Sequence, residues 1–148
     1  MTLPEQPDDS RTGDSGGTSG GRPLILIVEN EENNRRLVEQ ILGFAGYAFI
    51  SAANGLEALQ IIDRQPVDLI LIDLSMPVLD GYRTTQLIRQ RPQYATLPIV
   101  AVTAHAMSED REVALAAGCT DYLAKPYRPG QLLSVVQQML DGGPSIGG

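Results

Sequence analysis

Residue types that suit phosphorus chemistry follow several short apolar runs in this sequence. Glu29 and Asn30 follow one run, and Asp73, Thr103 and Lys125 each follow another. Carboxylate and amide oxygens are the hard ligands that Mg²⁺ prefers, and a lysine ammonium or a threonine hydroxyl can donate to phosphoryl oxygens. An aspartate beside a metal ion and a lysine can attack phosphorus and become an aspartyl phosphate. These residue types therefore indicate a phosphoryl-transfer pocket, provided that the fold brings them together.

The chain alternates short apolar runs with segments of helical periodicity. The runs cover residues 24–28, 47–52, 68–72, 98–102 and 121–124, and the helical segments cover 37–45, 55–62, 82–91, 108–117 and 132–140. This alternation is typical of an α/β fold with an open, doubly wound, five-stranded parallel sheet covered by helices on both faces. Such sheets carry their sites outside the carboxyl ends of the strands, where the strand order reverses. We therefore expect the polar residues to meet at that edge.

Composition limits the classes of function. A length of 148 residues suits one domain, and a net charge of −7 argues against direct binding to nucleic acid, which depends on neutralising phosphates with Lys and Arg. The single cysteine, Cys119, excludes an internal disulfide and favours a reducing, cytoplasmic location. No apolar run approaches the roughly 18 residues of a membrane span, so we expect no contact with a membrane.

The two ends of the chain differ in composition from the middle. Residues 1–22 are rich in Gly, Ser, Asp and Pro and have almost no apolar side chains to bury, which predicts a disordered tail. Residues 142–148 are predicted to form a flexible C-terminal tail for the same reason. The folded domain is expected to cover residues 23–141.

Three segments of the chain carry a resemblance to a known family. They read DLILIDLSMPVLDG, IVAVTAHA and GCTDYLAKP, and they contain Asp73, Thr103 and Lys125 in that order. In these motifs the chain resembles the receiver domain of two-component response regulators, the CheY-like family, over residues 23–141. The resemblance implies the flavodoxin-like receiver fold with strand order 2-1-3-4-5. Single-domain regulators and the receivers of hybrid kinases are the most similar members.

The resemblance also implies roles for single residues. Asp73 matches the phosphoacceptor, the Thr103 hydroxyl matches the group that follows the phosphoryl group, and Lys125 matches the lysine that pairs with phosphate. Tyr122 matches the switch aromatic that rotates inward on activation, together with Thr103. The bond between Lys125 and Pro126 is expected to be cis, a form that proline tolerates at low cost.

A magnesium site is implied at Glu29, Asn30 and Asp73, with the backbone of Ser75 as a further candidate ligand. The family normally closes its first strand with two acidic residues, as in VEDN, whereas VENE here puts a neutral Asn30 at a direct metal position. Losing one charge about 4 Å from a cation costs on the order of a few kcal/mol. We therefore expect Mg²⁺ to bind more weakly, by ~10-fold or more. A frame shifted by one residue would use Glu31 instead.

The resemblance implies a protein that accepts a phosphoryl group on Asp73 from a histidine kinase or a histidine phosphotransfer protein. It would not be an enzyme beyond phosphorylating itself from acyl phosphates and dephosphorylating itself. Because only eight residues follow Leu140, signalling is expected to run through protein contacts of residues 107–141. A stand-alone regulator and a piece of a hybrid kinase both fit the sequence.

Two other functions compete with this interpretation. The first is a pseudo-receiver that docks without phosphorylation, which Asn30 favours and the intact Asp73, Thr103 and Lys125 oppose. The second is an aspartate-nucleophile phosphatase. Those enzymes usually have a second Asp two residues after the nucleophile, where this chain has Ser75.

Several other polar residues have two interpretations. Asp80 is predicted to cap the following helix. His105 is either a residue at the mouth of the pocket or a solvated loop histidine, and Cys119 is expected to pack before the last strand. Arg35 and Arg36 lie either on a solvated helix face or on a surface that docks a kinase.

Overall fold

The computed structural model describes residues 23–74, 80–104 and 108–142. The strands are β1 (Leu24–Val28), β2 (Ala48–Ala52), β3 (Leu69–Asp73), β4 (Ile99–Thr103) and β5 (Asp121–Ala124). The helices are α1 (Glu32–Phe44), α2 (Gly55–Arg64), α3 (Gly81–Arg89), α4 (Ser108–Ala117), α5 (Pro129–Gly142) and a 3₁₀ turn, η1 (Pro92–Tyr94).

All five strands are parallel and form one sheet in the order β2-β1-β3-β4-β5. The predicted fold and strand order are therefore confirmed. The order reverses at β1 and β3, which lie side by side with Val28 opposite Ile72. Asp73 and Thr103 are the last residues of β3 and β4 and pair with Val102 and Ala124. Both residues were expected to follow their strands, and each strand extends one residue further because the sheet pairing continues through them.

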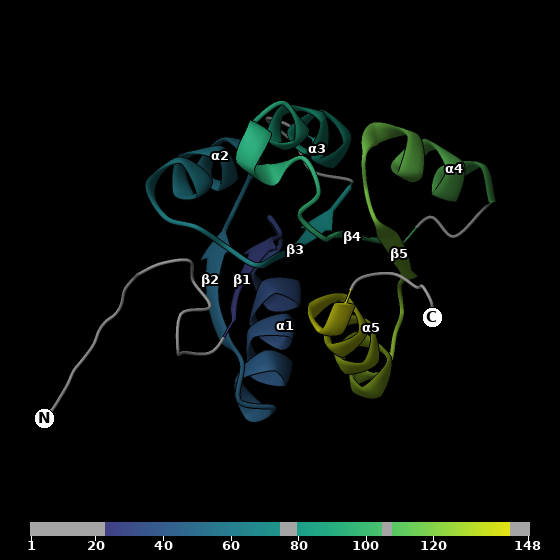
Figure 1. Ribbon diagram of the computed structural model, residues 1–148. Coiled ribbons are helices and arrows are strands. Elements are labelled where there is room, and N and C mark those ends of the chain that lie inside the picture. Colours follow the sequence, from purple (N-terminus) through teal and green to yellow (C-terminus); the bar gives the residue numbers. More distant parts are fainter. Residues whose placement is uncertain (1–22, 75–79, 105–107, 143–148) are drawn as a thin grey trace, which may run out of the picture.

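The sheet divides the hydrophobic core into two clusters. Helices α2, α3 and α4 cover one face, and α1 and α5 cover the other (Figure 1). The first cluster includes Ile62, Ile70 and Ile88, and the second includes Leu42 and Leu132. Strands buried on both faces need apolar side chains at every position, which explains the uninterrupted runs in the sequence.

Capping side chains hold the starts of α2 and α3. Asn54 accepts the amide of Glu57 at 2.9 Å at the start of α2, and Asp80 accepts the amide of Arg83 at 2.8 Å at the start of α3. The predicted cap at Asp80 is confirmed, and Asn54 caps α2 in the same way. Each of these caps starts a helix that follows a strand in the chain.

Two arginines, one at the end of α3 and one just after it, hold the helices of one layer together. Arg89 donates to the main-chain oxygens of Gly118 and Tyr94 at 2.8 and 2.9 Å and to the Thr120 hydroxyl at 3.1 Å. The second, Arg91, forms a two-bond ion pair with Asp63 of α2. We call Arg89 and Arg91 the arginine pair.

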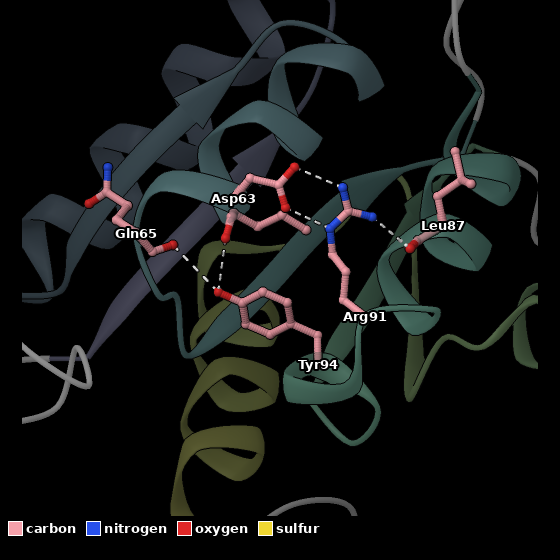
Figure 2. Close-up of polar contacts among 6 residues, drawn as sticks. Asp63, Gln65, Leu87, Arg91 and Tyr94 are labelled. Atoms are coloured by element: carbon pink, nitrogen blue, oxygen red, sulfur yellow. Dashed lines mark hydrogen bonds and ion pairs between the residues drawn. The ribbon is translucent and has the colours of Figure 1, made fainter.

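Figure 2 shows the geometry of Arg91 and its neighbours. The guanidinium group reaches the two carboxylate oxygens of Asp63 at 2.8 and 2.9 Å and the main-chain oxygen of Leu87 at 2.9 Å. Beside it, the Tyr94 hydroxyl points toward the Gln65 main-chain oxygen at 3.4 Å. These bonds connect the end of α2 to the end of α3 and to η1.

Within the residues that the structure describes, no helix is long and apolar enough to cross a membrane.

Candidate functional site

Polar side chains from four strand ends meet at the carboxyl edge of the sheet. The Lys125 ammonium nitrogen lies 3.2 Å from Oε1 of Glu29 and 3.8 Å from Oδ2 of Asp73. The amide of Lys125 donates to the main-chain oxygen of Thr103 at 2.7 Å. This bond holds Thr103 beside Lys125. Glu29, Asp73 and Thr103 are 5%, 7% and 1% exposed. We call Glu29, Asp73 and Lys125 the lysine cluster.

Glu29 is the most constrained member of the lysine cluster. Its Oε2 atom accepts the amide of Glu31 at 3.0 Å, while Oε1 faces Lys125. Burial, with a further contribution from the charge of Asp73, raises the pKa of Glu29 above its usual range, although the Glu31 amide and Lys125 oppose this. A buried carboxylate pair that shares one lysine carries excess negative charge, which a cation would neutralise.

Asp73 owes its position to close packing against the start of α3. A Cβ atom added to Gly81 would lie 2.3 Å from the main-chain oxygen of Asp73 and 2.6 Å from Cα of Leu74. The amide of Gly81 donates to the Leu74 oxygen at 3.2 Å. Only glycine allows this approach. The role of Gly81 was not predicted from the sequence, because the Asp80–Gly81 pair marks a helix start but not the close approach to Asp73.

The two residues that follow Glu29 do not enter the lysine cluster. Asn30 is exposed, and the Glu31 carboxylate accepts the Asn34 amide at 2.8 Å as the cap of α1. The shifted frame that would use Glu31 is therefore wrong, because β1 ends at Val28 and Glu31 is committed to the helix. The assignment of Asn30 to the second metal position stays a prediction.

The donor set fits a magnesium ion that keeps several of its waters. Glu29 and Asp73 supply two buried carboxylates at neighbouring strand ends, and the exposed Asn30 follows Glu29 in the chain and carries an amide oxygen. Among the residues described, no group of three or more His, Cys, Asp or Glu side chains could hold a metal. Ser75, the further candidate ligand, lies outside the described residues. The protein set is therefore smaller than a three-carboxylate site.

The structure tests some of the other predictions near the site and leaves others as predictions. The Lys125–Pro126 bond is cis, as expected. Tyr122 is half-buried and packs against the cluster under α2, α3 and α4, and its switching role stays a prediction. His105 lies outside the described residues. Tyr127, which the sequence argument did not single out, packs against the other cluster, and burial with the nearby Glu29 charge raises its pKa.

The remaining residues with two interpretations are now placed. Arg35 donates from Nη1 to the main-chain oxygen of Glu29 at 3.0 Å, whereas Arg36 pairs with Glu32 on the exposed face of α1. Cys119 is buried, as expected, and burial raises the pKa of its thiol to about 11. Arg35 is thus part of the structure around the site.

Comparisons with known proteins show which proteins this chain resembles. A family model described as response regulator receiver domain matches residues 25–137. The sensor histidine kinase RcsC of Salmonella typhimurium is 39% identical over 129 residues, which cover 87% of this chain and 13% of that protein. The chain therefore spans about an eighth of the length of this curated relative.

Solved structures show the same similarity in three dimensions. The receiver domain of the sensor histidine kinase PA1611 from Pseudomonas aeruginosa, solved with a magnesium ion in its active site cleft, has a TM-score of 0.77 and 38% identity over 82% of this chain and 100% of that one. The receiver domain of the Saccharomyces cerevisiae response regulator Ssk1, solved with the histidine phosphotransfer protein Ypd1, has a TM-score of 0.74 and 30% identity over 79% of this chain and 88% of that one.

Proposed function

Since the chain belongs to the response regulator receiver domain family, we propose that it accepts a phosphoryl group on Asp73 from a histidine kinase or a histidine phosphotransfer protein. Receiver domains are signalling phosphoacceptors of two-component systems rather than classical enzymes. The observation that carries the proposal is the lysine cluster, in which one ammonium group lies within 4 Å of both buried carboxylates. The magnesium-bound PA1611 receiver and the Ssk1–Ypd1 complex support the metal and the class of donor.

The chemistry proposed for Asp73 is a displacement at phosphorus. An Asp73 carboxylate oxygen attacks the phosphoryl group, the bond from phosphorus to the histidine nitrogen of the donor breaks, and that nitrogen keeps the electron pair. The Lys125 ammonium leaves Glu29 and turns to the new phosphoryl oxygens, and the Thr103 hydroxyl donates to another of them. A Mg²⁺ ion held by Glu29, Asp73 and Asn30 would neutralise charge on the transferring group.

The signal is proposed to pass through protein contacts. Thr103 is the last residue of β4 and pairs with Ala124 of β5, so a shift of Thr103 toward a phosphoryl group is felt in β5, which carries Tyr122. The proposed output surface is the face of α4, β5 and α5, within residues 107–141. The buried thiol of Cys119 is compatible with a reducing, cytoplasmic location.

Asn30 supports a second candidate, a pseudo-receiver that docks without phosphorylation. The amide removes one negative charge from the metal site and leaves Glu29 and Asp73 as its carboxylates. Against this candidate stands the retained contact of Lys125 with Asp73, at 3.8 Å. A receiver that had lost phosphorylation would have no need to keep this pair.

The test is the intact mass of the protein after incubation with acetyl phosphate, with and without Mg²⁺. We expect a single phosphoryl adduct on the wild type that requires Mg²⁺ and is lost in Asp73→Asn. The matched control is Asp63→Asn, which changes an exposed aspartate of α2 and should leave the adduct unchanged. A folded wild type without any adduct at high Mg²⁺ would overturn the proposal in favour of the pseudo-receiver. An adduct restored by Asn30→Asp would then identify the amide as the cause.

A further inference from the structure

The main chain leaves the sheet at Glu29, and the Glu29 side chain faces Lys125 in the lysine cluster. The amide of Glu29 still donates to the Ala52 oxygen of β2 at 3.0 Å. The Glu29 oxygen lies one residue beyond the last residue of β1 and accepts a bond from Nη1 of Arg35 at 3.0 Å. A side chain of α1 thus holds the peptide group that follows the strand.

Arg35 also closes a ring of hydrogen bonds with the start of α1. Its own amide donates to the Glu31 oxygen at 2.9 Å, and the Glu31 amide donates to the Glu29 carboxylate at 3.0 Å. Side chains in a helix point back toward the N-terminus, so an arginine in the first turn can reach the preceding strand end. The ring therefore links Glu29, Glu31 and Arg35 in one arrangement.

The neighbouring Arg36 has no part in this ring. Its guanidinium group pairs with the Glu32 carboxylate, and the two side chains are 67% and 62% exposed. Such an exposed pair contributes little to stability. Arg35 and Arg36 are therefore adjacent arginines of which only Arg35 bonds to Glu29.

We infer that Arg35 is a positioning residue for the metal site, because its bond to the Glu29 main chain aims the Glu29 carboxylate at Asp73 and Lys125. The inference rests on the proposed function. Asn30 supplies no charge, so the attraction of the site for Mg²⁺ depends on Glu29 and Asp73. The direction of the Glu29 carboxylate then matters more than it would in a site with a third acidic side chain.

The experiment is calorimetric titration of Mg²⁺ into the unphosphorylated full chain. The variants are Arg35→Met, which keeps the apolar stem but removes the donor, Arg35→Lys, which keeps a donor and the charge, and Arg36→Met as the matched control. We expect Arg35→Met to raise the Kd about fivefold, the scale of one lost hydrogen bond. Arg35→Lys should stay within about twofold of the wild type, and Arg36→Met should not change the Kd.

The sign of the effect separates positioning from simple charge. If Arg35 acted only as a cation near the metal, Arg35→Met would bind Mg²⁺ more tightly, and this result would overturn the inference. An equal loss in Arg35→Met and Arg36→Met would overturn it as well. Circular dichroism checks the fold, and Arg35→Gln replaces Arg35→Met if that variant does not fold.

Failure of the inference and failure of the proposed function give different results. A wild type that binds Mg²⁺ and forms the Asp73 adduct, beside an Arg35→Met variant with the same Kd, would overturn the inference alone. A wild type that neither binds Mg²⁺ nor forms the adduct would overturn the proposed function and the inference with it.

Discussion

The lysine cluster and the arginine pair are both groups of polar residues held among helices and strands, and they are built differently. Arg89 and Arg91 point their guanidinium groups at main-chain oxygens, at one carboxylate and at one hydroxyl in fixed directions, at 2.8–3.1 Å. Lys125 is shared between two carboxylates at 3.2 and 3.8 Å. The first arrangement is tight and directional, and the second is loose.

The difference follows from the chemistry of the two side chains. Arginine presents five donors in a rigid plane, whereas lysine is a point charge on a flexible stem. A planar fork suits contacts that must not change, such as those of Arg89 with Gly118 and Thr120. A point charge suits a contact that must change partners when a phosphoryl group arrives on Asp73. The comparison makes predictions in which one region changes and the other does not.

The largest effect is expected from Gly81→Ala, which disturbs the backbone under the lysine cluster. The added Cβ would lie 2.3 Å from the Asp73 main-chain oxygen, so α3 or β3 must shift. We expect a loss of about 3 kcal/mol in the free energy of unfolding in urea, with slower formation of the Asp73 adduct. The control is Gly130→Ala in α5, where nothing lies within 4 Å of the new Cβ. Equal stability of the two variants would contradict the close packing at Asp73.

The next effect is expected from Arg89→Met in the arginine pair. This change leaves the main-chain oxygens of Gly118 and Tyr94 without the arginine donor, whereas the Thr120 hydroxyl oxygen still accepts the amide of Ile99. We expect the free energy of unfolding in urea to fall by about 2 kcal/mol, while the Kd for Mg²⁺ stays unchanged. Arg83→Met, an exposed position on the same helix, should have little effect on either quantity. A changed Kd in Arg89→Met would show that the two regions are coupled.

A smaller effect, a gain in Mg²⁺ affinity rather than a loss of stability, is expected from Lys125→Met. Removing the ammonium group 3.2 Å from Glu29 leaves two carboxylates without their internal cation, so Mg²⁺ should bind more tightly. At an effective dielectric near 20 the gain is expected to be about tenfold in Kd, measured by calorimetric titration. Weaker binding would show that Lys125 orients the carboxylates rather than competing with the metal.

The smallest effect concerns Cys119, which lies beside the arginine pair with its sulfur 3.8 Å from the Thr85 hydroxyl oxygen. Burial raises the pKa of the thiol from 9.0 to about 11, so the native state keeps a proton that the unfolded state loses. Stability should therefore fall as pH rises from 9 toward 11. Cys119→Ala should remove a part of this loss worth about 1 kcal/mol at roughly pH 10.

The measurement compares urea unfolding of the wild type and Cys119→Ala between pH 8 and pH 10.5. Tyr94 and Tyr127 also have raised pKa values and contribute to the loss in both proteins, so only the difference in slope reports on Cys119. Identical slopes would contradict a protonated native thiol.

The fold was predictable because strands buried on both faces leave uninterrupted apolar runs. β1 and β3 show this pattern most clearly, whereas β2 lies at the sheet edge and only its last residue, Ala52, is fully buried. The ends of β3 and β4 were each one residue off, because a polar residue can still pair within a sheet. Asp73 and Thr103 are such residues.

The sequence predicted which residues meet at the site but not the contacts that hold them in place. Glu29, Asp73 and Lys125 meet as the strand ends indicated, but two supporting contacts left no readable pattern. The direction of Arg35 depends on how α1 starts, and its neighbour Arg36 has the same side chain with a different partner. The approach of Gly81 to Asp73 is a distance between two backbones, which a single sequence does not encode in any local pattern.

The division of the core by the sheet has a consequence for how this domain tolerates change. Ile62 belongs to the cluster under α2, α3 and α4, and Leu132 belongs to the cluster under α1 and α5. Because the sheet separates these two side chains, we expect the costs of substituting them to add, with an interaction energy near zero in a double-mutant cycle. One face can then accumulate substitutions in evolution without compensating changes on the other.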